Sequence, residues 1–392
     1  MAYNVLHKLN DNIAAIRIAL DSHTPSANEL VQLQRYSGFG GIKAILYPQG
    51  SKEEWIKQGA TKEDLRLYRS IQELHELLRS TFNDAEYKQV VQSIKNSVLT
   101  AFYTPAVVPQ VLYKVLQEHN IAVKSLYEPS AGAGIFISEA VSAFNDLQKI
   151  TAVEKDILTG KVLQALCSGL PVQSTIHISG FEETPDRENS KYDLVVSNIP
   201  FGNFPVLDVD FPDPAISGKI HNYFFAKGLD KLADGGIMAY ITTDAFLNSP
   251  SNKAVREYLF SKSDFISLSV MPDNLMKDTG NTEAPNHLLI VQKHSAKNGL
   301  SDDEQILLET IEQKNEFGIF HLNQYIKYHP EIICADEIKA GRNQYGNPNM
   351  EVWQNDINGI AEKLAATINE GFSSRFSLDY YQSIQLSEAV KE

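Results

Sequence analysis

The sequence predicts an α/β protein built on a doubly wound, mostly parallel sheet of seven strands. Short apolar runs bounded by turn residues alternate with segments of helical periodicity between residues 99 and 295. The run Tyr192 to Val196 has the apolar character of a parallel strand buried on both faces. A glycine turn, Gly132-Ala133-Gly134, joins an early strand to a helix and lets the backbone approach a ligand closely, although it lacks the third glycine of a dinucleotide fingerprint.

The composition is that of a globular protein with an acidic balance. The 392 residues are 43% hydrophobic and 21% charged, and the net charge is −14. This charge argues against a generic nucleic-acid binder. Cys167 and Cys334 are too few and too far apart for a disulfide framework or a zinc site. Because no long apolar run or basic-then-apolar leader is present, we expect neither a membrane span nor a signal peptide, and a cytoplasmic location.

The chain divides into three predicted regions. Residues 1–98 read as a helical N-terminal region, and residues 99–295 as the α/β domain. Residues 296–392, with 8 Lys/Arg against 16 Asp/Glu, read as an acidic, α-rich C-terminal region. Within it, Ser301 to Glu316 is expected to be helical and Gly341 to Pro348 to be a polar loop.

Two features precede the first predicted strand. The loop Tyr36 to Ile42 has three glycines around a Phe and indicates close backbone approach. It does not follow a clear strand, so a packed turn is favoured over a phosphate-binding loop. Farther on, Thr104 is a good N-cap with Pro105 at the first helical position, ahead of an amphipathic segment.

Polar residues follow the first three predicted strands. Glu128 ends the first strand just before the glycine turn, where its carboxylate could receive an ammonium group. Glu154 ends the second strand, at the distance from the turn where an acidic residue grips a ribose hydroxyl. Phe181 and Glu182 follow the third strand and could sandwich and hydrogen-bond an adenine. The alternative for this pair is a core Phe beside a surface Glu.

The hexapeptide Ser197-Asn198-Ile199-Pro200-Phe201-Gly202 ends the fourth strand. The Asn198 side-chain oxygen and the Ile199 carbonyl can accept both protons of a planar amino group. Pro200 fixes the backbone, and Phe201 offers a face on which a flat ring can stack. The alternative is a strand-end turn with a core Phe.

Four sequence motifs, in their order along the chain, resemble those of the gamma-type DNA adenine-N6 methyltransferases. The fold of that family is the Rossmann-like class I methyltransferase fold. Phe102-Tyr103-Thr104-Pro105 looks like motif X, and Glu128 to Gly134 looks like motif I. Glu154-Lys155 resembles motif II, and Asn198 to Phe201 resembles motif IV, with Ile199 where the family usually has a second Pro. The chain also looks like the methylase part of phage- and plasmid-borne helicase–methylase proteins.

The resemblance implies a role for each matching residue. Tyr103 and Thr104 would line the methionine end of S-adenosylmethionine, and Glu128 would hold its ammonium group. Glu154 would bind the ribose hydroxyls, and Lys155 would lie beside the adenine ring. The remaining members of the implied site are Ser130, Gly132 and Gly134 in the turn, Phe181 and Glu182 at the third strand, and Asn198, Ile199, Pro200 and Phe201 as catalytic residues.

Two departures from the family pattern stand out. The family usually has Asp-Phe after the third strand, whereas this chain has Gly180-Phe181-Glu182. The family also often has an aromatic residue near the last hairpin to clamp the target base. None is present at residues 283–287, which leaves His287 or Phe204 for that role.

The resemblance implies that the protein methylates the N6 amino group of an adenine flipped out of double-stranded DNA. S-adenosylmethionine would be the cofactor, no metal is implied, and the context would be restriction-modification on a bacterial, phage or plasmid mobile element. The DNA substrate would be bound by residues 1–98 or by a helicase or specificity module absent from this chain. The alternatives are a methyltransferase of a protein glutamine or an RNA base, and a decayed DNA- or partner-binding protein of this fold.

Overall fold

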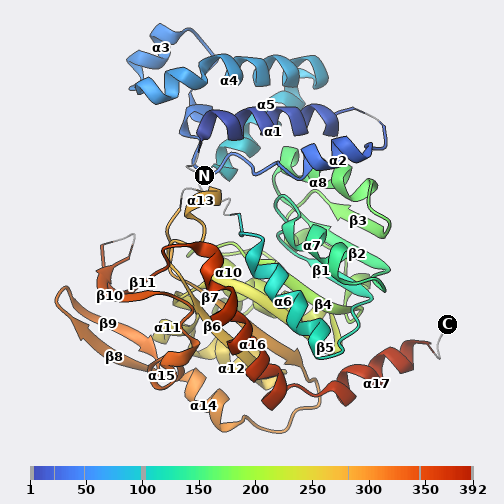
Figure 1. The fold of residues 1–392 in the computed structure, drawn as a ribbon, viewed down its shortest axis with the longest axis vertical. Helices are drawn as coiled ribbons and strands as arrows, with labels where there is room; N and C mark the ends of the chain where they lie inside the picture. The colour runs from blue at the N-terminus through green and yellow to red at the C-terminus, as the bar shows by residue number, and fades with distance from the viewer. Residues whose placement is uncertain are drawn as a thin grey trace.

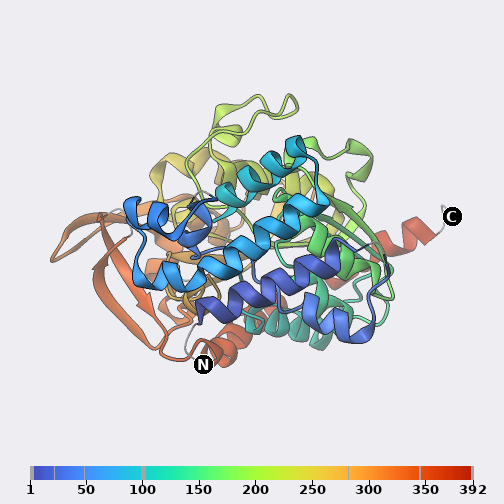
Figure 2. The same ribbon diagram turned by 90° about the horizontal axis from the view of Figure 1, so that it is seen from above.

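The computed structural model describes residues 4–21, 23–47, 49–98, 103–280, 282–343 and 346–389. The N-terminal helices form a layer across one end of an α/β body (Figure 1). Seen from above, α1, α4 and α5 run side by side over that body (Figure 2). The C-terminal hairpins project from the flank of the body, and helix α17 leads away from it (Figures 1 and 2).

A seven-stranded sheet in the order β3-β2-β1-β4-β5-β7-β6 forms the centre of the body. Strands β1 to β5 pair in parallel, and β7 is antiparallel to both β5 and β6. The predicted doubly wound, mostly parallel sheet is confirmed, in the strand order of a class I methyltransferase fold. The strands are β1 (Ser125–Glu128), β2 (Lys149–Val153), β3 (Gln173–His177), β4 (Tyr192–Asn198), β5 (Leu232–Thr243), β6 (Ser263–Met271) and β7 (Asn286–Lys293).

Each face of the sheet has its own core, because successive strand residues point to opposite faces. Leu194 and Val196 of β4 pack beneath α6, α7 and α16, whereas Val195 packs beneath α10 and α12. Helix α8 contributes to the first of these cores and also to the core of the N-terminal region. These helices are α6 (Val107–Glu118), α7 (Ile135–Ala143), α8 (Ile157–Ser168), α10 (Ile220–Lys231), α12 (Lys253–Ser261) and α16 (Ala361–Arg375).

The N-terminal region packs on the outer side of α8. Four of its helices begin with capping boxes, in which a Ser, Thr or Asn and an acidic residue three positions on satisfy each other's backbone amides. Leu158, Val162 and Leu166 of α8 join the core of this region. Its helices are α1 (Val5–Ala19), α2 (Ala27–Leu33), α3 (Lys52–Lys57), α4 (Lys62–Thr81) and α5 (Asp84–Ser97).

The glycine-rich loop after α2 is a packed turn, the interpretation that the sequence favours. Tyr36 and Phe39 are buried in the N-terminal core. Gly38 has a φ of +60°, and a Cβ built there would lie 1.7 Å from the Tyr103 hydroxyl. The side-chain amide of Asn12 donates to the Gly38 carbonyl at 2.6 Å, which fixes the turn against α1. Any other residue at Gly38 would therefore displace Tyr103.

The C-terminal region contains two hairpins that the sequence analysis did not predict. The predicted helix from Ser301 to Glu316 is wrong beyond Leu308, because the following residues alternate between half-buried and exposed positions, as strand residues do. The predicted loop from Gly341 to Pro348 is the tip of the second hairpin, with residues 344 and 345 outside the described part. The elements are α14 (Asp302–Leu308), β8 (Thr310–Asn315), β9 (Gly318–Asn323), α15 (Gln324–Tyr328), β10 (Glu337–Arg342), β11 (Pro348–Trp353) and α17 (Leu378–Ala389).

Helix α16, from beyond residue 295, covers β6 at the end of the sheet. A Cβ at Gly371 would lie 2.3 Å from the Ile266 carbonyl oxygen, so the two backbones meet closely. Within the described part of the chain, no helix is both long and apolar enough to cross a membrane. The shorter helices are α9 (Pro214–Ser217), α11 (Ala245–Asn248), α13 (Lys277–Gly280), and the 3-10 turns Lys43–Leu46, Phe181–Glu183, Asp186–Glu188, Pro250–Asn252, Pro330–Ile332 and Ile357–Ile360.

Candidate active site

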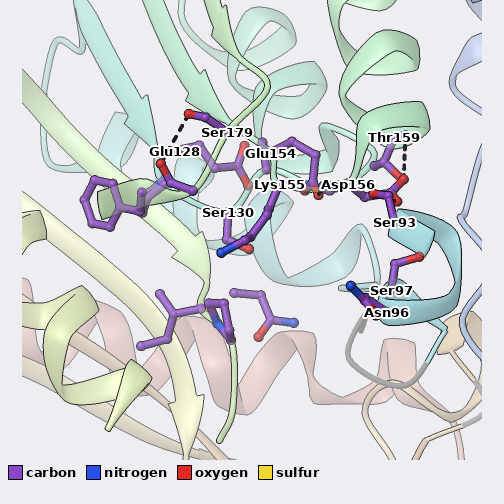
Figure 3. Close-up of a pocket in the computed structure, with 18 of the residues that line it drawn as sticks. Ser93, Asn96, Ser97, Glu128, Ser130, Glu154, Lys155, Asp156, Thr159 and Ser179 are labelled. Carbon is purple, nitrogen blue, oxygen red and sulfur yellow. Dashed lines mark hydrogen bonds between the residues drawn. The ribbon is translucent and has the colours of Figure 1, made fainter. Parts of the chain in front are cut away.

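One cavity of about 890 Å³ lies at the carboxyl ends of β1, β2 and β4. This is the edge at which open α/β sheets bind ligands. The side chains of Glu128 and Ser130 lie on one side of it, and those of Ser93, Asn96 and Ser97 lie across from them (Figure 3). The predicted site residues that line it are Tyr103, Thr104, Glu128, Ser130, Gly132, Glu154, Lys155, Phe181, Glu182, Asn198, Ile199, Pro200 and Phe201.

The glycine turn between β1 and α7 needs both of its glycines, for different reasons. Gly132 has a φ of +52° and lines the cavity. Gly134, with a φ of +80°, is not part of the cavity wall. A Cβ at Gly134 would lie 2.7 Å from Leu163 of α8, so this glycine lets α7 start close to α8. The structure therefore separates the two predicted turn residues into one cavity residue and one packing residue.

Glu128 is a buried carboxylate facing the cavity. Only 1% of it is exposed, and within the described part of the chain its Oε2 has no hydrogen-bond partner. Burial, together with the nearby Glu154 carboxylate, raises the pKa of Glu128 well above its usual value. A buried polar atom without a partner is costly, and a cationic ligand group would relieve that cost. This observation fits the ammonium group that the sequence assigned to Glu128.

Glu154 braces the glycine turn with both oxygens. Its Oε2 accepts the backbone N–H of Gly132 at 2.8 Å, and its Oε1 accepts that of Asp156 at 2.7 Å. Burial and the Asp156 carboxylate raise the pKa of Glu154 to about 7, although the two backbone N–H groups lower it. Glu154 thus joins the end of β2 to the turn after β1.

Lys155, Phe181 and Glu182 form the outer part of the cavity. Lys155 donates to Glu182 at 3.0 Å in an ion pair whose lysine is largely exposed. The Phe181 ring is 3% exposed and packs against Phe224, with 5.0 Å between the ring centres. Phe181 is thus a core residue that also lines the cavity, and its contact with an adenine stays a prediction.

The four middle residues of the hexapeptide at the end of β4, Asn198 to Phe201, line the cavity. The Ile199 N–H continues the sheet by donating to the Ile241 carbonyl at 3.0 Å, and Ile199 is buried. The Asn198 amide donates to the Met276 sulfur at 3.6 Å, so a residue of the segment between β6 and β7 orients Asn198. Neither the order nor the spacing of the motifs indicates that Met276 contacts Asn198.

The structure distinguishes His287 from Phe204, the two candidates for the residue that clamps the target base. His287 is 2% exposed within β7 and does not line the cavity. Phe204 lines the cavity and is 45% exposed. Its ring lies next to Gly202, where a Cβ would approach it to 2.3 Å. Of the two candidates for the aromatic role, Phe204 is therefore the one that lines the cavity.

Tyr103 is held by two segments that are far from it in the sequence, one beside Lys8 and one in α13; its motif neighbour Phe102 lies outside the described residues. The hydroxyl of Thr279 donates to the Tyr103 carbonyl. The ammonium of Lys8 donates to the carbonyls of Gly40 at 3.1 Å and Thr279 at 3.0 Å, and it lies 5.8 Å from the centre of the Tyr103 ring. Burial lowers the pKa of Lys8 to about 8. We name these contacts the Lys8 junction.

Sequence reasoning missed one side of the cavity altogether. Six residues of α5 line it: Lys88, Gln89, Gln92, Ser93, Asn96 and Ser97. Their spacing of one, three and four residues places them on one helical face. A polar face beside buried Val90 and Ile94 was visible in the sequence, but solvent is the usual neighbour of such a face.

The sheet has the strand order of the class I methyltransferase fold, and the cavity lies at the edge where that fold binds its ligands. Residues 121–274 match the model of the family described as Eco57I restriction-modification methylase. This match confirms the prediction that the segment is a methylase domain of the restriction-modification kind, with S-adenosylmethionine as its cofactor.

The chain is also similar to individual proteins. It is 26% identical over 207 residues to the defense against restriction protein B of Escherichia phage P1, a match that covers 51% of this chain and 8% of the relative. The chain thus spans less than a tenth of that relative's length. A class I methyltransferase of Listeria monocytogenes shares 15% identity at a TM-score of 0.44, over 75% of this chain and 91% of its own. A type I modification subunit of Vibrio vulnificus shares 14% identity at a TM-score of 0.43, over 90% and 89% of the two chains.

Cofactor affinity should depend on pH through Glu154. At pH 6 this carboxyl, with a pKa of about 7, holds a proton in the free protein. Hydroxyl and ammonium groups of a ligand favour the ionised carboxylate, so binding releases protons and tightens as the pH rises. We expect the dissociation constant of S-adenosylmethionine to be roughly tenfold higher at pH 6 than at pH 7.5.

Calorimetry in two buffers of different ionisation enthalpy measures the proton release; Glu154→Gln is the control. Equal affinity at both pH values would contradict the assignment.

Proposed function

We propose that this protein transfers a methyl group from S-adenosylmethionine to the N6 amino group of an adenine flipped out of duplex DNA. One observation carries the proposal: the buried carboxylate of Glu128 and the half-buried carboxylate of Glu154 share a single cavity with Asn198 and Phe201. The carboxylates suit a ligand with an ammonium group and ribose hydroxyls. The amide and ring suit a planar base that carries an amino group.

In this proposal Asn198 and Ile199 prepare the target amine. S-adenosylmethionine supplies an electrophilic methyl group on its sulfonium. The Asn198 side-chain oxygen and the Ile199 carbonyl accept the two amino hydrogens and draw the nitrogen toward tetrahedral geometry. Its lone pair then points at the methyl group; the N–C bond would form as the bond from the methyl carbon to the sulfonium breaks, with the neutral thioether S-adenosylhomocysteine as the leaving group, and the product amine releases one proton to water. Positioning, rather than acid–base catalysis, carries the rate.

The aromatic residues of the cavity would hold the extruded base. Extrusion of an adenine costs a few kcal/mol. Stacking on an aromatic face returns roughly 1–3 kcal/mol per base. Phe201 is the ring of the motif, and exposed Phe204 lies on the same part of the cavity wall. We therefore assign both rings to the target base.

Transfer of labelled methyl groups to defined substrates tests the function. We expect label on adenine N6 in duplexes that contain adenine, and none when every adenine already carries an N6-methyl group. Matched reactions use structured RNA and a protein substrate with exposed glutamine. Label confined to RNA or protein would replace DNA as the substrate class, and no transfer by a chain that fails to bind S-adenosylmethionine would indicate a decayed site.

We propose the three predicted regions as the domain organisation of the chain, with residues 99–295 as the catalytic domain. Residues 1–98 and 296–392 would be accessory, although α8 and α16 tie both to the sheet. DNA would be the partner, together with a helicase or specificity module outside this chain.

DNA affinity of the isolated chain should be weak, with a shallow dependence on salt. Each phosphate contact contributes about −0.9 to the slope of log affinity against log salt. Residues 296–392 carry 16 acidic against 8 basic residues, whereas α4 exposes Arg66 and Arg69. We expect Arg66→Ala with Arg69→Ala to lower the affinity, and Lys327→Ala with Arg342→Ala to leave it unchanged. Fluorescence anisotropy over a salt series measures both. Nanomolar binding at physiological salt that depends on the second pair would overturn this prediction.

A further inference from the structure

The polar face of helix α5 borders the cavity, where Ser93 and Ser97 are half-buried while Gln92 and Asn96 remain exposed. Its opposite face is anchored by Val90 and Ile94, which are buried in the core shared with α8. The cavity-facing residues include an amide pair, in which Gln92 donates to the Asn96 side-chain oxygen at 2.9 Å. Amide side chains offer both donors and acceptors.

A chain of hydrogen bonds ties α5 to the glycine turn. The Ser93 hydroxyl donates to the Asp156 carboxylate at 2.7 Å and accepts the N–H of Ile157, the first residue of α8, at 3.0 Å. The Asp156 N–H then donates to Glu154, and Glu154 accepts the Gly132 N–H. The middle of α5 is therefore fixed beside the residues proposed to bind the ribose.

The direction of α5 sets which part of the cavity each residue reaches. Asn96 and Ser97 lie at the end of the helix that leads to Tyr103, across the cavity from Ser130 (Figure 3). Lys88 lies at the other end, about 12 Å away at 1.5 Å per residue. Ser93, beside Asp156, lies between them.

We propose that α5 is the second wall of the S-adenosylmethionine site. Asn96 and Ser97 contact the methionine end, Gln92 and Ser93 lie along the ribose, and Lys88 lies at the adenine end. This inference rests on the proposed function and extends the cofactor site beyond the methylase domain into residues 1–98. The N-terminal region then takes a direct part in binding the cofactor.

The chemistry of this face favours the cofactor over a nucleic-acid strand. Strands are gripped mainly by Lys and Arg on phosphates, and α5 brings only Lys88 to the cavity. Neutral amides and hydroxyls suit the adenosine and carboxylate groups of the cofactor. The carboxylates of Glu128, Glu154 and Asp156, which also line the cavity, would repel phosphates and attract a cationic ligand.

Calorimetric titration with S-adenosylmethionine and S-adenosylhomocysteine tests the second wall. Each neutral hydrogen bond lost weakens binding by roughly two- to tenfold. We expect the double variant Gln92→Ala/Asn96→Ala to bind both ligands roughly 5- to 50-fold more weakly. Lys95→Ala, on the same helix but outside the cavity lining, is the matched control and should bind as the unaltered protein does. Binding by the double variant within twofold of the unaltered protein overturns the inference.

Hydrogen exchange supplies a second readout that needs no variant. S-adenosylhomocysteine should slow amide exchange in α5 more than in α3, which does not line the cavity. Equal protection of both helices in a chain that binds the ligand overturns the inference and leaves the proposed function intact. Failure of the unaltered protein to bind either ligand overturns the proposed function itself.

Discussion

Asn198→Ala should lower methyl transfer by roughly 100-fold or more, the loss expected when a positioned polar group is removed from a transition state. The variant removes one of the two acceptors proposed for the target amine. Because Asn198 is proposed to contact the target amine, and its amide donates to Met276, affinity for S-adenosylmethionine should change little. Single-turnover transfer of labelled methyl groups, with calorimetry in parallel, measures both quantities.

Two companion variants sharpen this result. Asn198→Asp keeps an acceptor oxygen and should recover part of the lost rate. Met276→Leu removes the sulfur acceptor at similar volume and should cost less than Asn198→Ala, because it changes only the orientation of the amide. Near-normal turnover by Asn198→Ala would show that the motif at the end of β4 is misassigned.

Glu154→Ala should weaken S-adenosylmethionine binding by about 1.5–3 kcal/mol, the range for a hydrogen bond to a charged group. The structure adds a second cause, since the substitution also frees the N–H groups of Gly132 and Asp156. The glycine turn then loses its brace as well as its ligand contact. Calorimetry near pH 7.5 measures the change.

Glu182→Ala is the matched control for that variant. Its carboxylate lies in a partly exposed pair with Lys155, and such pairs are worth at most about 1 kcal/mol. We expect its effect on affinity to be smaller than that of Glu154→Ala. An unchanged dissociation constant for Glu154→Ala would mean that the ribose is held elsewhere.

The sheet could be predicted because its signals are local. The run Tyr192 to Val196 is buried on both faces, and Gly132 occupies a backbone conformation that favours glycine. The strand-end residues Glu128, Glu154 and Asn198 then share one edge because parallel strands end together. The match of residues 121–274 to a methylase family spans these three strand ends.

The parts of the fold and site that could not be predicted depend on contacts between segments that are distant in the sequence. Nothing near Ser93 in the sequence indicates that its hydroxyl completes the start of α8. The contact between Met276 and Asn198 joins residues 78 apart, and the approach of Gly38 to Tyr103 crosses two regions. The hairpin after Leu308 escaped prediction because its acidic sequence suits a helix, while its half-buried alternation appears only against neighbouring elements.

The Lys8 junction sets an order of events during synthesis. The ammonium of Lys8 and its acceptor at Thr279 are 271 residues apart. At 5–20 residues per second, roughly 15–50 s separate their emergence from the ribosome. Helices α1 to α5 can fold in that interval, but the junction beside Tyr103 cannot close. This part of the cavity wall is therefore completed only after Thr279 has been made.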